Sequence, residues 1–237
     1  MACIRTTRLE FRRLTRIVAN LAESLLNADR KLAARPDDDQ RLPLHWAASY
    51  NRLPIVELLA EQKDFDVDAQ DGAGWTALMM AASLKDGDQL VDLLLAKGAD
   101  PNIKTNNGQT ALHFTASKAN LDTARKLIAQ KATARVKDKR GQLPLHRAAA
   151  IGNVTIIKLL LDNKSPINAT DVDGSTALHH ATSEGHGEAA LVLLRAGAES
   201  DKKDNRGDLA IPLAPPTVRS YISRMADEEG LTVLLKE

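Results

Sequence analysis

Short apolar segments with helical spacing alternate with polar, glycine-containing turns along most of the chain. A four-residue motif opens these segments, and its last residue stands at positions 45, 79, 113, 146, 179 and 212, in steps of 34, 34, 33, 33 and 33 residues. The copies are LPLH at 42–45, TALM at 76–79, TALH at 110–113, LPLH at 143–146, TALH at 176–179 and the degenerate LAIP at 209–212. This period predicts a repeat array in which each unit covers the apolar face of its neighbour.

Each repeat is expected to contain a turn followed by two helices. Glycine in the turns permits positive φ, while Asp or Asn bonds nearby backbone donors. Thr at the start of the motif predicts a helix N-cap, and Pro in the second place fits the first helical position. The residues concerned are Thr76, Thr110, Thr176, Pro43 and Pro144.

A second apolar run in each repeat predicts the second helix. Examples lie at 55–59, 90–94, 156–161 and 189–194. These runs have helical spacing but nothing within their own repeat large enough to cover them, so stacked neighbours must do so. Gly98 and Gly197 follow two of the runs and predict helix ends in the left-handed conformation.

The period and the motif together resemble the ankyrin-repeat family, over nearly the whole chain. The resemblance implies an all-α ankyrin-repeat solenoid of about seven helix-turn-helix units with turn or β-hairpin tips. We therefore expect a single domain, 1–237, in which the motif histidine bonds loop backbone between repeats. Its parts are an N-terminal capping repeat at 7–36, repeats at 37–70, 71–104, 105–137, 138–170 and 171–203, and a divergent C-terminal capping repeat at 204–237, where Pro212, Pro215 and Pro216 interrupt the first helix.

Composition excludes several classes of protein. The 237 residues are 43% hydrophobic and 27% charged, and no apolar run approaches the roughly 18 residues that span a bilayer. The single cysteine, Cys3, excludes an internal disulfide framework and indicates a reducing compartment. Lys and Arg number 32 against 31 Asp and Glu, which is not the charge of a nucleic-acid coat. We expect a cytoplasmic and nuclear protein, monomeric when free, with no nucleic-acid or membrane partner.

The first 16 residues are rich in arginine. Such a start resembles a mitochondrial transit segment or a nuclear signal. We favour a solvated helix face instead, because the apolar positions between the arginines continue into the next helix without a break. A wrongly chosen start codon is a further alternative. The residues concerned are Arg5, Arg8, Arg12, Arg13 and Arg16, with Leu9, Leu14, Ile17 and Val18 turned inward.

No motif indicates catalysis, so we expect no enzyme, no cofactor and no metal. Glycine-rich phosphate loops and the G-x-S-x-G, C-x-x-C and H-E-x-x-H patterns are absent. His179, His180 and His186 could form a metal site, but the first is the motif histidine and the last lies in the usual interhelical loop. Asp37, Asp38 and Asp39 lack the glycine and terminal glutamate of a calcium loop, so a turn is favoured.

In the ankyrin family the concave face, built from turn tips and first helices, recognises partners. Both tryptophans fall on positions that face this groove, and Trp, Tyr and Arg dominate binding hot spots. For Trp46, Met80 and Phe114, packing between first helices is an open alternative, whereas Trp75 and Arg41 at the turn tips favour contact. The candidate protein-binding residues are Asp39, Arg41, Trp46, Ser49, Tyr50, Asp71, Trp75, Met80, Ser83, Phe114, Ser117, Lys118, Arg140, Arg147, Ile151, His180, Ser183 and Glu184.

Charge on this face is graded along the chain. Repeats 2 to 5 carry basic residues and repeat 6 carries acidic ones. Because complementary fields orient partners, we expect a partner with carboxylates opposite the middle repeats and a basic patch opposite repeat 6. The residues are Arg41, Lys118, Lys139, Arg140 and Arg147 on the basic side and Asp173 and Glu184 on the acidic side.

Within the ankyrin family the chain is similar to the gankyrin-like group, seven-repeat non-ATPase proteins of the proteasome, and to its fungal members. The stretches that carry the likeness are 41–47, 71–75, 113–118 and 146–150. The likeness implies a chaperone whose concave face holds the C-terminal domain of a proteasomal AAA ATPase subunit during assembly of the base of the 26S regulatory particle. It also implies that Arg41 and Lys118 pair with carboxylates of that partner.

One departure limits this likeness, and one alternative function stays open. Residues 178–184 lack the cysteine of the L-x-C-x-E motif by which the group's mammalian member binds retinoblastoma protein, so that activity is not implied. The alternative function is a generic ankyrin adaptor or inhibitor with a kinase, transcription or ubiquitin-ligase partner.

Overall fold

The computed structural model describes residues 20–231, so the arginine-rich start lies outside the described residues. The chain divides into two compact units, unit 1 up to Thr105 and unit 2 from Asn106 onward. The expected single domain and its repeat boundaries stay a prediction.

Unit 1 contains two helix pairs preceded by a short helical segment. Residues 20–28 are helical, and the 3-10 helix η1 (Arg30–Ala34) follows them. The first pair is α2 (Pro43–Ser49) with α3 (Leu53–Leu59), and the second is α4 (Ala77–Ala82) with α5 (Asp88–Ala96). The first helices α2 and α4 pack side by side, as do the second helices α3 and α5.

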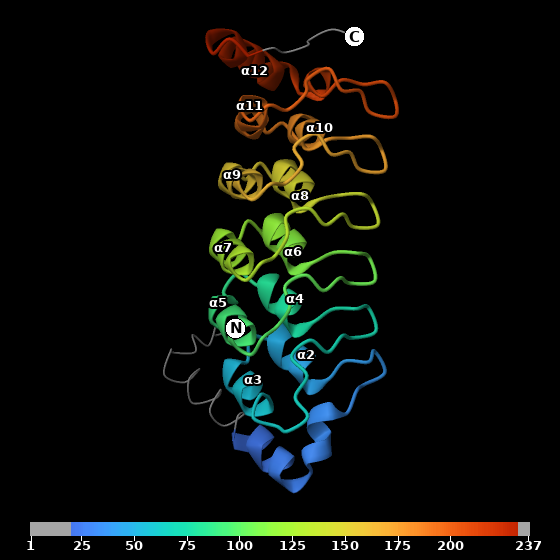
Figure 1. Cartoon of the computed structure of the whole chain (residues 1–237), viewed down its shortest axis with the longest axis vertical. Coiled ribbons are helices and arrows are strands. Elements are labelled where there is room, and N and C mark those ends of the chain that lie inside the picture. The colour runs from blue at the N-terminus through green and yellow to red at the C-terminus, as the bar shows by residue number, and fades with distance from the viewer. Residues whose placement is uncertain (1–19, 232–237) are drawn as a thin grey trace, which may run out of the picture. The chain divides into compact units, whose positions relative to one another are not determined.

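Unit 2 stacks three helix pairs in two rows (Figure 1). The first helices are α6 (Ala111–Lys118), α8 (Pro144–Ala150) and α10 (Ala177–Ser183), and the second helices are α7 (Leu121–Ala129), α9 (Val154–Asp162) and α11 (Gly187–Arg195). Neighbouring helices contact each other along both rows. The turns between repeats project from the side of the first helices (Figure 1). The second helices therefore form an outer face, away from the turns.

This architecture confirms the predicted all-α solenoid. Among residues 20–231 there is no named strand, and one isolated antiparallel bridge joins Lys203 to Leu209 in the last turn. Helix starts follow the predicted cap chemistry: the Thr76 and Thr176 side chains accept the N–H of the third helical residue, and Pro43 and Pro144 are first helical residues. The expected left-handed ends occur at Gly98 (φ 89) and Gly197 (φ 91).

Small residues dominate the contacts between first helices. All six residues of α4 are buried, and three of them are alanine. The largest fully buried side chains are almost all Leu and Ile, including Leu112, Leu145 and Ile157. Alanine lets neighbouring helices approach closely, and this explains why a chain with only 3% aromatic residues can build a dry core.

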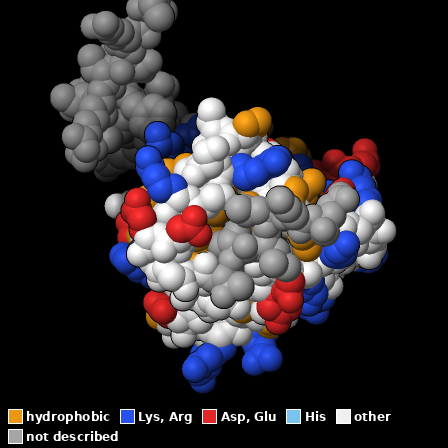
Figure 2. All heavy atoms as spheres, turned by 90° about the horizontal axis from the view of Figure 1, so that it is seen from above, with side chains coloured by type: hydrophobic (Ala, Val, Ile, Leu, Met, Phe, Trp, Pro, Cys, Tyr) orange, Lys and Arg blue, Asp and Glu red, His pale blue; other side chains and the backbone are white. Residues whose placement is uncertain are grey.

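The C-terminal end departs from the helix-pair pattern, as the prolines predict. In place of a first helix stands the 3-10 helix η2 (Ile211–Leu213), and α12 (Pro216–Glu228) packs on α11 through buried Ile222 and Ala226. Figure 2 looks onto this end of unit 2, where basic and acidic side chains are interspersed and hydrophobic ones form only small patches. A polar outer surface is what a terminal repeat requires, because no further repeat covers it.

Candidate protein-binding face

A turn carboxylate recurs at the start of the repeats and closes the turn in the same way each time. One oxygen of Asp71 accepts the backbone N–H groups of Ala73 and Trp75, both at 2.9 Å. Asp138 and Asp171 accept the N–H groups two and four residues further on at 2.9 to 3.0 Å. These bonds fix the turn from which the first helix starts.

In the turns of Asp37, Asp138 and Asp171, the second carboxylate oxygen accepts from a side chain on the first helix, nine residues further along the chain. Asp37 Oδ2 accepts the indole Nε1–H of Trp46 at 2.8 Å. In unit 2 the corresponding pairs are Asp138 with Arg147 and Asp171 with His180, each at 2.9 Å. In these three repeats the residue at the tenth place is therefore held in one orientation by the turn of its own repeat, whereas Asp71 holds Arg41 instead.

In unit 1 this arrangement produces an exposed cluster, which we call the Trp46 cluster and define as Asp37, Arg41, Trp46, Tyr50 and Asp71. The Arg41 guanidinium lies 5.0 Å from the Trp46 ring centroid and donates from Nε to Asp71 Oδ2 at 3.1 Å. Tyr50 stacks on Trp46 with ring centroids 6.2 Å apart and 16° between the planes. Trp46 is 37% exposed and Tyr50 is 63% exposed, so each ring contacts its neighbours on one side and solvent on the other.

An open hollow of about 420 Å³ lies beside these rings. Its walls combine apolar and cationic groups, contributed by Pro43, Trp46, Ala47, Tyr50, Arg52 and Ile55. Such a hollow can receive an apolar side chain of a partner, while Arg41 and Arg52 can meet carboxylates at its edge.

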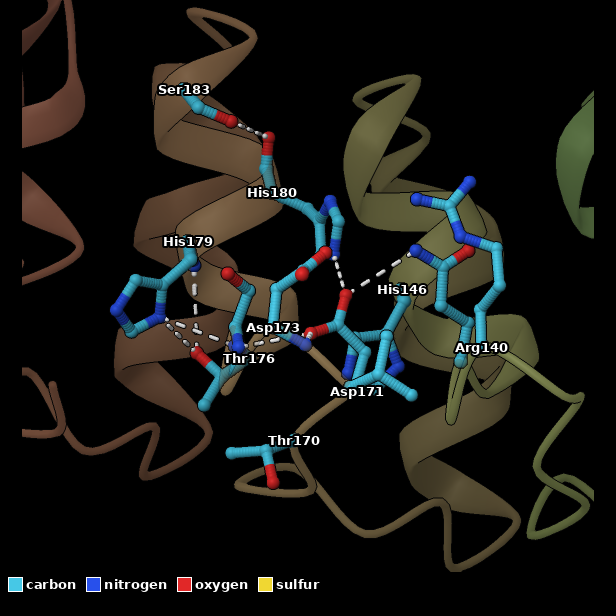
Figure 3. A network of polar contacts seen from close by, with 12 residues as sticks. Arg140, His146, Thr170, Asp171, Asp173, Thr176, His179, His180 and Ser183 are labelled. Atoms are coloured by element: carbon cyan, nitrogen blue, oxygen red, sulfur yellow. Dashed lines mark hydrogen bonds and ion pairs between the residues drawn. The ribbon is translucent and has the colours of Figure 1, made fainter. Parts of the chain in front are cut away.

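In unit 2 the turn carboxylate meets polar side chains instead of an indole (Figure 3). Asp171 Oδ2 accepts from His180 Nε2 at 2.9 Å and from Gln142 Nε2 at 3.3 Å. The His180 ring stands edge-on to His146, with centroids 5.6 Å apart. Asp171 thus joins two consecutive repeats within unit 2.

These contacts set the charge states of unit 2. Burial opposes ionisation of Asp171, but the hydrogen bonds from His180 and Gln142 outweigh it and hold the pKa of the carboxyl below its usual value. The pKa of Asp138 is lowered against burial by Arg147 and by the backbone N–H of Gln142. Burial, with the nearby His180, lowers the pKa of His146 to about 4, so this ring is neutral in the folded protein near pH 7.

The motif histidines have the structural role expected of them. The His146 Nδ1 accepts the N–H of Leu143 at 3.0 Å, and its Nε2 faces the Ala169 carbonyl at 3.1 Å. His45 and His179 bridge from their own helix start to the next loop in the same way. His186 Nε2 faces the Ala150 carbonyl at 3.1 Å. Among residues 20–231 no group of three potential metal ligands gathers.

The structure places most of the predicted contact residues at the surface. Arg41, whose side chain is 34% exposed, Trp46 and the half-buried Trp75 are neither enclosed in the core nor on the outer face. The others that are exposed or half-buried are Asp39, Ser49, Tyr50, Ser83, Phe114, Ser117, Lys118, Arg140, Arg147, Ile151, His180, Ser183 and Glu184. Their contact with a partner stays a prediction.

Two predicted contact residues are buried and need correction. Met80 is only 6% exposed, in agreement with the alternative that it packs between helices. Asp71 is also 6% exposed, and its carboxylate already accepts hydrogen bonds from two backbone N–H groups and from Arg41. Asp71 therefore orients Arg41 and is not itself a surface contact.

Sequence reasoning places Asp37, Asp138 and Asp171 in turns, but it misses the bond that each of them makes to a side chain on the first helix. The bond from Gln142 to Asp171 is missed as well. Asp138, Asp171 and Gln142 are buried and Asp37 is exposed, and the three aspartates fix side chains that are candidates for contact with a partner. The repeat itself carried a signal for them: a polar or aromatic side chain recurs nine residues after each of these aspartates, at Trp46, Arg147 and His180.

Comparison with known proteins gives one family. The sequence model of the family described as "Ankyrin repeats (3 copies)" matches residues 17–105, 78–171 and 112–204. An ankyrin repeat-containing protein of Schizosaccharomyces pombe, C6C3.08, is 39% identical over 93 residues, 38% of this chain and 40% of that protein. A probable 26S proteasome regulatory subunit p28 of Saccharomyces cerevisiae is 37% identical over 110 residues, 45% of this chain and 48% of that protein.

Other relatives share only a small part of their length. The mouse ankyrin repeat and SAM domain-containing protein 6 is 41% identical over 86 residues, which is 36% of this chain and 10% of that protein. The chain thus spans less than half of each of these relatives. No helix within residues 20–231 has the length and apolar character to cross a membrane.

Proposed function

Since the chain belongs to the ankyrin-repeat family, whose repeats are protein-binding modules, we propose that it is a non-catalytic chaperone of proteasome assembly. Its partner is the C-terminal domain of a proteasomal AAA ATPase subunit, held by the concave face while the base of the 26S regulatory particle forms. The likeness to the yeast protein named as a probable 26S proteasome regulatory subunit supports this partner. The expected location in cytoplasm and nucleus belongs to the same proposal.

The Trp46 cluster is the observation on which this function rests. Hot spots of interfaces are enriched in Trp, Tyr and Arg held in place before binding, since preorganisation removes the entropic cost of ordering them. Trp46 is fixed by Asp37 and Tyr50, and Arg41 by Asp71. Among the described residues the Arg41 guanidinium bonds through Nε alone, which leaves its Nη groups for a carboxylate of the partner.

Unit 2 supplies the second cation of the proposed interface. Lys118 is exposed at the end of α6, next to the left-handed Ala119 (φ 58). With Arg41 in unit 1 it matches the two basic positions that the gankyrin-like group uses toward partner carboxylates. Binding to the ATPase C-terminal domain would sterically block premature docking of that domain on the proteolytic core of the proteasome. The interface between the two proteins would bury roughly 1,600–2,000 Å² in total.

The experiment is a binding assay of the purified protein with the six ATPase C-terminal domains. We expect one domain to bind, and Trp46→Ala to weaken that binding about 30-fold or more, as for a hot-spot residue. Arg41→Glu with Lys118→Glu should weaken it further. Glu57→Gln and Thr155→Ala, which change exposed side chains on the second helices α3 and α9, away from the turns and first helices, are the matched controls and should leave the affinity unchanged.

Equal binding to all six domains, or to none, would overturn the proposal. Affinity purification from cells with mass spectrometry decides the alternative. Co-purification of a kinase, a transcription factor or a ubiquitin ligase without proteasome base subunits would identify a generic ankyrin adaptor.

A further inference from the structure

The near-zero net charge of the chain conceals two blocks of opposite sign. Residues 36–104 hold 13 Asp and Glu against six Lys and Arg, whereas residues 121–168 hold ten Lys and Arg against three Asp. The basic block covers α7, α8 and α9 in unit 2. Only part of it lies on the face already described, so the rest of the positive charge needs a separate account.

Four of these cations lie in register on the outer face of unit 2. Arg125 and Lys158 are separated by one repeat of 33 residues, and so are Lys131 and Lys164. All four are exposed, and α7 and α9 are packed neighbours in the row of second helices (Figure 1). Because packed helices lie about 8–10 Å apart, equivalent positions form a compact array. We call these four residues the outer basic patch.

Three residues of this patch, Arg125, Lys158 and Lys164, have weak pairing or no pairing with acidic side chains of the described residues. Arg125 meets Asp122 at 3.7 Å, with both side chains mostly exposed, a geometry that contributes little. The side chains of Lys158 and Lys164 form no hydrogen bond or ion pair with any other residue in the part of the chain that the structure describes. On the next helix, by contrast, Arg195 is held at 2.6 Å by Glu229 and at 3.5 Å by Glu188.

The backbone conformation gives a second, independent observation. Lys131 (φ 66) and Lys164 (φ 65) follow the ends of α7 and α9 in the left-handed region, at the place where Gly98 and Gly197 stand in other repeats. A residue with a side chain adopts this conformation at a cost of about 1 kcal/mol, which glycine avoids. The turn itself therefore does not require lysine in these two repeats.

We propose that the outer basic patch binds an acidic polypeptide segment, at a surface separate from the first-helix face. An open hollow of about 250 Å³ between α9 and α11 is lined by the apolar residues Leu161, Val192 and Ala196 and by the charged residues Lys158, Arg195 and Asp162. It can seat an apolar side chain of a segment whose carboxylates meet the cations. Residues 121–168 contain no Trp, Tyr or Phe on which bases could stack, so a polypeptide fits better than a single-stranded nucleic acid.

The test uses the full chain and a fluorescent peptide of about 12 residues, glutamates with two leucines, which can reach across two helices when extended. Its anisotropy is followed at about 50 mM salt, where screening is weak. Lys131→Gly with Lys164→Gly removes two cations while it gives the backbone the residue that the turn prefers. Arg125→Gln with Lys158→Gln removes the other two. Each double variant should weaken binding about fourfold, and the quadruple variant more than tenfold.

The controls separate a local site from general attraction. Lys85→Gln with Lys97→Gln removes two exposed lysines of unit 1 and should change binding less than twofold. A peptide with glutamine in place of glutamate should not bind. Unfolding of the same variants by urea shows whether the lysines stabilise the helix ends and do not bind a partner. A variant that loses stability but keeps its affinity for the peptide would overturn the proposal. An equal loss in the unit 1 control would do so too, as would stronger binding of a thymidine oligonucleotide than of the acidic peptide.

Discussion

The Trp46 cluster of unit 1 and the group around Asp171 in unit 2 have the same arrangement but different side chains. We call the latter, which consists of Asp171, Gln142, His146 and His180, the Asp171 network. In each, one oxygen of a turn aspartate closes the turn and the other holds the side chain nine residues later. In unit 1 that side chain is an indole that faces solvent beside Tyr50 and Arg41. In unit 2 it is an imidazole, in contact with a buried histidine.

This difference shows that the turn aspartate maintains the fold, while the residue at the tenth place determines which chemical group lies at the surface. The turn aspartate satisfies backbone donors whichever side chain it also holds, so the tenth place can change without a change of fold. Trp46 presents a large, partly exposed apolar ring, whereas His180 presents a smaller polar ring that is already bonded to Asp171. Two tests ask whether the scaffold of unit 2 depends on its buried groups, and two ask whether positions on the surface can be exchanged.

The largest effect is expected from Asp171→Ala. The substitution leaves the N–H groups of Asp173 and Ser175 and the side chains of Gln142 and His180 without their acceptor. Since a buried donor left unsatisfied costs about 1–3 kcal/mol, we expect a loss of about 4 kcal/mol, measured by urea unfolding. Asp173→Ala, at an exposed place on the same turn, is the matched control and should change stability by less than about 0.5 kcal/mol. Similar losses from the two variants would contradict the role of the carboxylate.

A dependence on pH should come next. The His146 Nδ1 accepts a backbone N–H, and burial lowers its pKa from an ordinary 6.5 to about 4. Below pH 6.5 the unfolded chain takes up a proton that the folded ring refuses, so stability falls between pH 6.5 and about 4 and is intact above that range. The shift corresponds to roughly 3 kcal/mol. Urea unfolding at a series of pH values measures this fall.

His146→Gln is the control for that titration. Glutamine loses some of the hydrogen bonds and lowers stability at every pH, but it has no proton to take up. The difference between the two proteins should therefore shrink as the pH falls from 7 to 4.5, where Asp138 and Asp171, with their lowered pKa values, are still ionised. A difference that stays constant with pH would assign the pH dependence to other groups.

A smaller effect on stability is expected from Trp46→His, which gives unit 1 the side chain of repeat 6. Histidine can still donate to Asp37, but the stacking with Tyr50 and the cation–π contact with Arg41 are largely lost. We expect a loss of about 1 kcal/mol in urea unfolding, since such exposed contacts contribute about 0.5–1 kcal/mol each. The free energy of binding to the proposed ATPase domain should be reduced by far more than the free energy of unfolding. If binding survives, the indole is part of the scaffold and the comparison with unit 2 fails.

The features of the fold and of the candidate site that could be predicted from the sequence are those that recur with the repeat period. The caps at Thr76 and Thr176, the histidine bridges and the glycine helix ends recur at fixed spacing, so the sequence predicts them reliably. The period also gives the place of Met80 and Asp71, but not their burial. That depends on which neighbouring groups complete the packing and hydrogen bonding around a position, and no periodic pattern contains those contacts.

The smallest effect on stability tests the left-handed helix ends: unit 1 has Gly98 at this place, whereas unit 2 has Lys131 and Lys164 in two repeats and Gly197 in the third. Replacing either lysine by glycine removes a strain of about 1 kcal/mol but adds freedom to the unfolded chain, which costs about 0.4–1 kcal/mol. The favourable interaction of a lysine with the helix end, about 0.3–1 kcal/mol, is lost as well. These terms nearly cancel, so urea unfolding should change by less than about 0.5 kcal/mol per site. Gly98→Lys is the reverse control and should be nearly neutral by the same arithmetic; a large loss there, with none at Lys131 or Lys164, would mean that unit 2 has adapted to lysine at these helix ends through contacts that unit 1 lacks.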